Sequence, residues 1–211
     1  MARVKTPEAI LSYPNIFEPR GMENQTPKYS ACLIFPAGTD LKELKAAALA
    51  AAIERFGKEV KVGQTTIPIN KALQTGVLYW PFRDEPDDVA AKGYPEGCTF
   101  FNARSQRKPA VVSIYPDANG KPSVIEDPEK VYPGVIVMAT VDPYTFDREG
   151  NRGVTFGLGN LQVIRDGDRL DGAVAASEEF DADLTAAADL SDLTDEDQPL
   201  PEGDDLSDLI G

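Results

Sequence analysis

The chain is 211 residues long, contains no histidine and has a formal net charge of −14. This length suits one well-buried domain with a tail better than two domains. Without histidine the chain has no Ser-His or Cys-His nucleophile, no histidine acid–base catalyst and almost no means of binding zinc, so most enzyme classes are disfavoured and no cofactor or metal is expected.

The negative charge is concentrated at the C-terminal end. Residues 177–211 hold thirteen Asp and Glu and no Lys or Arg, whereas residues 1–176 hold 22 acidic residues against all 21 basic ones. The terminal segment repels itself and has one aromatic residue, so it cannot bury enough apolar surface to offset the entropy of ordering it. The sequence therefore predicts a folded domain over 1–176 and a disordered acidic tail over 177–211.

No signal peptide or membrane segment is expected. The N-terminus, MARVKTPEAI, lacks an apolar run, and the longest strictly apolar stretch is the eight residues from Ala46 to Ile53. Cys32 and Cys98 are isolated from each other in the sequence and are predicted to fill a core rather than to form a disulfide framework. These features predict a soluble protein of a reducing cytoplasm, with no membrane partner.

The first half of the chain mixes strands with one helix. Residues 28–35, KYSACLIF, alternate between apolar and polar positions at first, as a half-buried strand does. Asp40 followed by Glu43 is a capping pattern, and the apolar stripe after it predicts a helix over about 40–56 that stops at a glycine. Residues 57–97 are punctuated by Gly and Pro, which predicts long loops with short strands.

From residue 98 onward the pattern is that of strands. CTFFNAR alternates, and Asn119-Gly120 is a strong hairpin-turn signal. Two long apolar segments flank residues 147–152 and predict an antiparallel hairpin. In its second arm the apolar phase slips once, which predicts a bulge near 157–160 that would bend the strand, as a small curled barrel requires.

The segment FFNARSQRKP carries the most informative chemistry. On a strand, Phe100, Asn102 and Arg104 project from one face, while Phe101 and Ala103 project from the other. An aromatic plane, an amide and a guanidinium on one face suit single-stranded nucleic acid, because each base offers a ring to stack on and each linkage a phosphate to pair with. The same pattern also fits a solvated edge strand with Phe100 buried.

The C-terminal end predicts a docking segment. The chain ends with an acidic stretch followed by apolar residues, DDLSDLIG, which would suit a basic groove with an apolar pocket. Such a segment can recruit partner proteins, and it can act as a phosphate mimic that competes for a nucleic-acid site of its own protein. The predicted docking residues are Asp204, Asp205, Leu206, Asp208, Leu209 and Ile210.

Six segments in order resemble a known family: LSYPNIFEPR, PKYSACLIFP, LYWPFRDE, FFNARSQRKPAVV, VYPGVIV and GNRGVTFGLGNLQVIRDGDRLDG. Their order and spacing over about 170 residues are similar to those of bacteriophage single-stranded DNA-binding proteins, long filed as a domain of unknown function. The resemblance implies a mainly β OB-fold, a five-stranded curled barrel with long loops. It also implies a protein that coats single-stranded DNA in phage replication or recombination, largely without sequence preference, in the cytoplasm of the infected host.

The strand faces, together with this resemblance, predict a non-catalytic DNA-binding protein whose acidic tail binds replication or recombination proteins. Phe100 is expected to stack on a base, with Tyr29 and Tyr115 as further candidates and Asn102 beside them. The expected phosphate-binding residues are Arg20, Lys28, Arg83, Arg104, Arg107 and Lys108. This chain ends in Ile210-Gly211 and not in the aromatic residue of the bacterial tails, a difference that bears on whether it engages host partners.

Two other interpretations remain open from the sequence. A β-rich virion structural or assembly module would use the acidic tail for docking and would bind no oligonucleotide. A metal-dependent nuclease would use Asp84, Asp87 and Asp88 of the acidic cluster DEPDD to hold a divalent cation, although the composition of that cluster favours a turn-rich, solvated loop.

Overall fold

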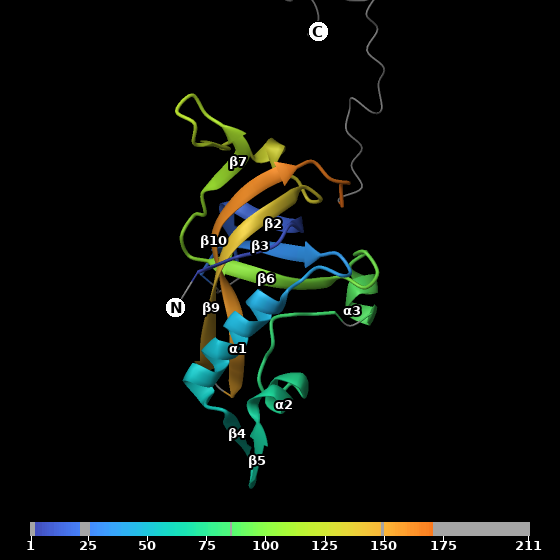
Figure 1. Ribbon diagram of the computed structural model, residues 1–211, viewed down its shortest axis with the longest axis vertical. Coiled ribbons are helices and arrows are strands. Elements are labelled where there is room, and N and C mark those ends of the chain that lie inside the picture. The colour runs from blue at the N-terminus through green and yellow to red at the C-terminus, as the bar shows by residue number, and fades with distance from the viewer. Residues whose placement is uncertain (1–2, 22–25, 85, 149, 171–211) are drawn as a thin grey trace, which may run out of the picture. The chain divides into compact units, whose positions relative to one another are not determined.

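The computed structural model describes residues 3–21, 26–84, 86–148 and 150–170. Five long strands carry the fold (Figure 1). They are β2 (Ala9–Arg20), β3 (Lys28–Phe35), β6 (Thr99–Ser105), β9 (Ile136–Arg148) and β10 (Asn151–Arg165). The predicted domain boundary at 176/177 and the predicted tail lie outside the described residues.

The five strands close into a barrel. Their hydrogen-bonded order is β9-β2-β3-β6-β10, and β10 pairs again with β9 to complete the ring. All the pairs are antiparallel except β6 with β10, which is parallel at Phe156↔Ala103 and Gly157↔Arg104. A five-stranded Greek-key barrel is the architecture of the OB-fold, and the predicted fold class is therefore confirmed.

Three short strands extend the ring. β1 (Val4–Lys5) pairs with β9, and β7 (Val111–Pro116) pairs with β10 and with β8 (Pro122–Val124). The β7–β8 hairpin turns at Gly120, whose N–H donates to the carbonyl of Asp117 at 3.0 Å and whose φ is +73°. The hairpin predicted from Asn119-Gly120 is confirmed. After this hairpin, a short 3₁₀ helix, Pro128–Lys130, precedes β9.

Aromatic and aliphatic side chains fill the barrel. Phe35, Phe101 and Phe156 are fully buried, and the ring of Phe101 lies 4.5 Å from that of Phe156 and 5.4 Å from that of Phe35. Burying each such ring stabilises the fold by about 1.5–3 kcal/mol relative to leaving it exposed. The inward alternation of Phe101 and Ala103 on β6 agrees with the sequence pattern.

The predicted helix is confirmed as α1 (Lys42–Phe56), which runs beside β9 and β10 in Figure 1. The N-cap residue is Leu41 and not the predicted Asp40, although a carboxylate oxygen of Asp40 accepts a hydrogen bond from the N–H of Lys42 at 3.0 Å. The helix is followed by Gly57, with φ +83°. Leu44, Ala48 and Ala52 form the buried stripe that packs α1 on the core.

The region 57–97 contains more regular structure than the predicted loops with short strands. It holds a β4–β5 hairpin (Glu59–Val62 and Thr65–Pro68) and two six-residue helices, α2 (Ile69–Gln74) and α3 (Pro86–Ala91). The sequence predicted one helix and missed α2 and α3. Helices this short carry fewer than two turns of periodicity, and α2 is held by burial of Ile69, Ala72 and Leu73.

The β3 strand is buried on both faces from Ala31 to Phe35. Cys32 and Ile34 point away from the barrel interior, yet they are buried with Val89, Tyr94, Cys98 and Phe100 in a second, smaller cluster. Both cysteines thus lie in a core, as predicted. None of the helices within the described ranges has the length and hydropathy needed to span a lipid bilayer.

The long β9–β10 hairpin bends at the predicted bulge. Its register shifts between Leu158 and Leu161, and the N–H of Asn160 donates to Oγ1 of Thr140 at 2.8 Å. A Cβ at Gly159 would lie 2.4 Å from the same Thr140 oxygen, so only glycine fits there. This bend lets β10 pair with β6 over one stretch and with β7 over the next.

Candidate nucleic-acid interface

The outer face of β3 and β6 presents polar side chains. Ser30 is the register partner of Arg104, and Cys32 is the partner of Asn102, while their neighbours Ala31 and Ala103 are buried inside the barrel. We call the residues Asn15, Ser30, Asn102, Arg104 and Gly157 the β3–β6 outer face. In OB-folds, this strand pair and the two adjoining loops are where oligonucleotides bind.

Five of the predicted phosphate-binding residues meet at one end of these strands. Arg20 on β2 is the register partner of Lys28 on β3. Arg104 on β6 is the partner of Ser30, which lies two residues after Lys28 on β3. Arg107 and Lys108 follow in the loop after β6. We call this set the basic end: Arg20, Lys28, Arg104, Arg107 and Lys108.

The cations of the basic end are not neutralised by the described part of the chain. There the ion pairs are Arg3–Asp142, Lys42–Asp40 and Arg165–Glu8, none of which uses a cation of the basic end. Arg20, Arg104, Arg107 and Lys108 are exposed, and Lys28 is half-buried. Cations that no described acidic residue pairs with can contact phosphates, and such contacts supply most of the non-specific affinity for nucleic acid.

Arg83 lies elsewhere on the outer side of β6. Its backbone exchanges two hydrogen bonds of 2.9 Å with Phe100, and its guanidinium carbon sits 5.6 Å from the centre of the Phe100 ring. The guanidinium also donates to the Tyr79 hydroxyl at 3.5 Å, which raises the pKa of Arg83 further above its ordinary value. Arg83 thus continues the polar surface beyond Asn102, away from the basic end.

The expected stacking role of Phe100 is wrong for this structure. Phe100 does point to the outer side, but its ring is 0% exposed, with Tyr94 packed edge-on at 5.1 Å and the Arg83 guanidinium above it. The segment of Val89 and Tyr94 covers it, so the ring offers no face to a base. The alternative interpretation of the sequence was right that Phe100 is buried, but β6 is not an edge strand, because it pairs with β3 on one side and with β10 on the other.

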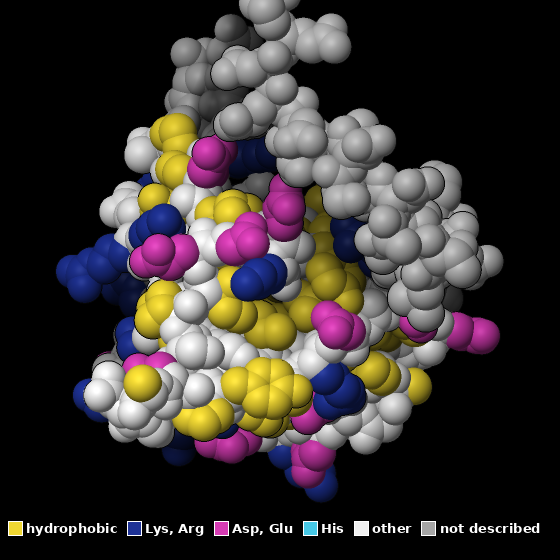
Figure 2. Space-filling view, turned by 90° about the horizontal axis from the view of Figure 1, so that it is seen from above, with side chains coloured by type: hydrophobic (Ala, Val, Ile, Leu, Met, Phe, Trp, Pro, Cys, Tyr) yellow, Lys and Arg dark blue, Asp and Glu magenta, His cyan; other side chains and the backbone are white. Residues whose placement is uncertain are grey.

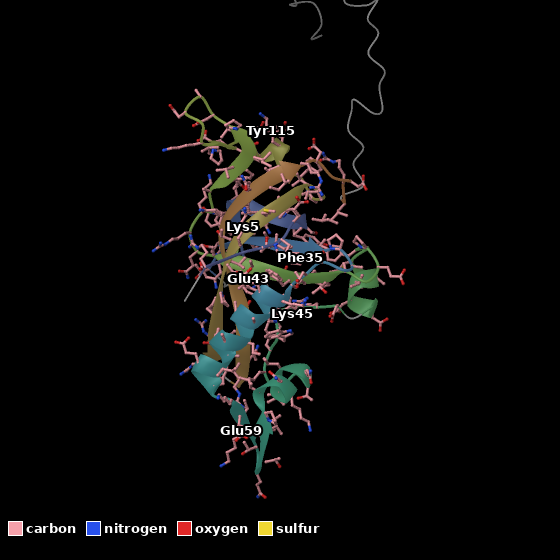
Figure 3. The ribbon with its side chains drawn as sticks, in the orientation of Figure 1. Lys5, Phe35, Glu43, Lys45, Glu59 and Tyr115 are labelled. Atoms are coloured by element: carbon pink, nitrogen blue, oxygen red, sulfur yellow. The ribbon has the colours of Figure 1, made fainter. Side chains whose placement is uncertain are left out.

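The two tyrosine candidates are separated. Tyr29 is half-buried beside the basic end, where it pairs with Ser105. Tyr115 is 72% exposed on β7, outside the five-stranded ring (Figure 3). Its neighbours Ile114 and Val124 are exposed too, and hydrophobic side chains lie open among charged ones in the view of the domain from above (Figure 2). The structure therefore does not bring Tyr115 together with the other candidates.

Tyr13 is a candidate that the sequence patterns missed. It lies within the register shift of β2 between Ser12 and Asn15, its side chain is 63% exposed, and Lys92 Nζ lies 6.0 Å from the ring centre. Its φ of +45° is strained for a bulky residue, and such strain concentrates at functional sites. The available signal was the Tyr13-Pro14 pair, which interrupts an otherwise apolar strand.

Tyr144 flanks the other side of the outer face. It is 39% exposed and pairs with Thr155 on β10, two residues before Gly157, the partner of Arg104. The outer face therefore has an exposed aromatic ring on each side, Tyr13 from β2 and Tyr144 from β9. Aromatic rings beside a row of cations are what non-specific recognition of a single strand uses.

The Cys32 thiol and the Tyr94 hydroxyl near this surface both resist ionisation. Burial raises the pKa values of both the Cys32 thiol and the Tyr94 hydroxyl, which donates to Ser12 Oγ at 3.0 Å. Asp84, Asp87 and Asp88 are exposed at the start of α3. Residues 3–21, 26–84, 86–148 and 150–170 contain no group of three acidic or cysteine side chains placed to hold a metal ion.

Known structures share this architecture. The chain is similar to the "single-stranded DNA-binding protein from bacteriophage Enc34 in complex with ssDNA", with a TM-score of 0.58 and 21% identity over 79% of this chain and 88% of that one. A further structure of the same phage protein gives a TM-score of 0.54 at 21% identity, covering 85% of this chain and 90% of that chain. At this identity the likeness shows the fold.

Sequence comparison adds a family. The chain is 32% identical over 193 residues to "Putative protein p50" of Acyrthosiphon pisum secondary endosymbiont phage 1, covering 88% of this chain and 95% of that protein. The family model described as "Enterobacter phage Enc34, ssDNA-binding protein" matches residues 2–192. Because this match spans nearly the whole chain, the protein belongs to the Enc34 phage ssDNA-binding protein family.

Proposed function

We propose that this protein binds single-stranded DNA without catalysis, through the β3–β6 outer face and the basic end. The observation that carries the proposal is the meeting of five cations, none in an ion pair with another described residue, at one end of the strand pair that OB-folds use for oligonucleotides. The family relationship and the name of the Enc34 protein support the same ligand.

Each part of the surface has a separate role in this proposal. Arg20, Lys28, Arg104, Arg107 and Lys108 pair with phosphates, with Arg83 further along. Tyr13 takes the stacking role expected of Phe100, with Tyr29, Tyr144 and Asn102 as neighbours. Base contacts of this kind rely on the ring faces that all four bases share, so the protein coats DNA largely without sequence preference.

The biological setting and the tail complete the proposal. The protein coats single strands during phage replication or recombination in the infected cell. Residues 177–211, with thirteen acidic residues and no basic ones, bind replication or recombination proteins and compete for the basic end when DNA is absent. The terminal residues Asp204, Asp205, Leu206, Asp208, Leu209 and Ile210 form the docking end of that segment.

The test is fluorescence anisotropy of labelled oligo-dT and of a matched duplex, titrated with full-length protein over a range of salt concentrations. We expect tight, salt-sensitive binding to the single strand and little to the duplex. Replacing Arg104, Arg107 and Lys108 by Ala should weaken binding and flatten its salt dependence, by about 0.7 in logarithmic slope for each phosphate that is no longer paired with a cation.

A matched triple variant separates local contacts from net charge. Lys42, Arg55 and Lys58 are exposed cations at the two ends of α1, and their replacement by Ala removes the same charge. It should leave the slope nearly unchanged. Equal effects of the two triple variants would disprove the basic end as the DNA site, and no binding by the wild-type protein would favour the virion assembly module.

A further inference from the structure

A cavity lies apart from the surface assigned above. It has a volume of about 360 Å³ and is bounded by the end of α2, by residues 76–80 and by residues 150–152 of the β9–β10 hairpin. Two aromatic residues, Tyr79 and Trp80, line it together with the polar residues Gln74, Asn151 and Arg152. A hollow of this size that combines aromatic walls with a few polar groups is typical of a small-ligand site.

The aromatic walls are held in place by other rings. Tyr79 packs on Phe146 with ring centres 5.9 Å apart, and Trp80 packs on Phe82 at 5.2 Å. Both lining rings are half-buried, so part of each remains accessible. Because these rings are already held by packing, binding a planar ligand would cost little additional side-chain entropy.

The backbone around the cavity is fixed by close approach to β10. The N–H of Tyr79 donates to the carbonyl of Arg152 at 2.9 Å, and the N–H of Val154 donates to the carbonyl of Tyr79 at 3.0 Å. A Cβ at Gly153 would lie 2.4 Å from that Tyr79 oxygen, so glycine is required for this approach. Residues 76–80 are thereby joined to the same strand that borders the outer face.

The cavity continues the DNA surface proposed above. Arg83, on the outer side of β6, donates to the Tyr79 hydroxyl at 3.5 Å. Along β10, Gly153 beside Tyr79 and Gly157 beside Arg104 are four residues apart, which is about 13 Å at the rise of a strand. A single strand that contacts Arg104 and runs toward Arg83 would reach the cavity within a short stretch.

We propose that this cavity holds one unstacked base of the bound single strand, an inference that rests on the proposed function. The Trp80 and Tyr79 rings supply the stacking surface, and the amides of Asn151 and Gln74 supply donors and acceptors for base edges. Arg152, whose guanidinium makes one long hydrogen bond to the Lys61 carbonyl, pairs with the adjoining phosphate.

Trp80 provides a direct readout because it is the chain's one tryptophan. Full-length protein is titrated with unlabelled oligo-dT while Trp80 emission is recorded, and a parallel titration follows the anisotropy of labelled oligo-dT. We expect the emission to change and to saturate at the same DNA concentration as the anisotropy. Saturating anisotropy with unchanged emission would overturn the cavity proposal and leave single-strand binding intact.

An abasic scan locates the base. Oligo-dT strands of the shortest length that saturates the protein, each lacking one base, are tested in turn. At one or two adjacent positions the emission change should disappear and the affinity should fall about 5- to 150-fold, which corresponds to the usual worth of one stacked base. An emission change that is equal for every abasic position would mean that Trp80 senses binding at a distance, and it would overturn the proposal.

Side-chain variants complete the test. Asn151→Ala should weaken oligo-dT binding several-fold, whereas Asn70→Ala, an exposed asparagine on α2 that does not line the cavity, should not. If both variants bind like the wild type and the abasic scan is flat, the cavity takes no base. Absence of any anisotropy change in the wild-type protein would instead refute the proposed function, and the cavity proposal with it.

Discussion

Tyr13 combines a strained backbone conformation with a side chain that is exposed to solvent. A bulky residue at φ +45° stores strain of order 1–3 kcal/mol, and 63% exposure means that little burial offsets it. Tyr13 lies beside Asn15 and Ser30, on the β2 side of the outer face. The strained backbone conformation therefore places the ring next to the proposed DNA site. The conformation fits a ring that is kept ready for a base.

Replacing Tyr13 by Gly should therefore separate stability from binding. Glycine adopts this φ without strain, so the melting temperature should rise or stay level, while affinity for oligo-dT should fall by about 1–3 kcal/mol. Thermal unfolding and anisotropy titration measure the two effects. Tyr115→Ala serves as the comparison, because Tyr115 is also exposed but lies outside the barrel ring. Unchanged affinity of the glycine variant would exclude Tyr13 from the site.

The β6 residues show how far a strand pattern predicts a site. Alternation correctly assigned Phe101 and Ala103 to the barrel interior and Asn102 and Arg104 to the outside. It could not show that Phe100 is covered, because the covering Tyr94 belongs to a separate segment whose packing depends on tertiary contacts. Periodicity gives the face of a residue, while burial of that face depends on the rest of the chain.

Elements with local signals were predictable, and those without them were not. The α1 helix has an aspartate just before its first turn, an apolar stripe and a glycine after its last residue, and the β9–β10 bulge shows as a phase slip. The short helix α2 has no such signals, and α3 begins with Pro86 and two acidic residues but is too short to show an apolar stripe. A six-residue helix is stabilised mainly by what it packs against. The parallel β6–β10 pair that closes the ring is likewise a long-range contact.

The bulge in β10 requires a glycine at position 159, and a substitution there tests this requirement. In Gly159→Ala the new Cβ would meet Thr140 Oγ1 at 2.4 Å and the Thr140 carbonyl oxygen at 2.7 Å, so the hairpin must shift. Overpacking of this kind should lower the free energy of unfolding by about 1–3 kcal/mol. Urea denaturation measures the decrease.

Gly120→Ala provides the comparison for that variant. Gly120 has φ +73° but open space around its Cβ position, so its replacement introduces only the backbone strain of about 1–2 kcal/mol and no clash. It lies in the β7–β8 turn, outside the barrel ring. If Gly159→Ala were as stable as the wild-type protein, the bulge would not depend on the absence of a side chain.

At the scale of the molecule, charge is distributed by region. Residues 1–176 are almost neutral in sum, but the fold gathers five cations from three segments at the ends of β2, β3 and β6. Composition alone reveals how many cations there are, and only the strand register shows that these five meet. An acidic isoelectric point therefore does not oppose DNA binding, because residues 177–211 carry thirteen of the fourteen net negative charges.

Deleting residues 177–211 tests whether that acidity competes with DNA. The shortened chain should bind oligo-dT more tightly at low salt, and the difference should shrink as salt rises, because the screening length falls from about 30 Å at 0.01 M to about 3 Å at 1 M. A full-length variant with the tail Asp and Glu changed to Asn and Gln should behave like the deletion, since it keeps the length and removes the charge. Equal affinities of all three proteins at low salt would limit the tail to partner binding or solubility. A gain in the deletion alone would instead point to the bulk of the tail, because the neutral variant would still obstruct the basic end.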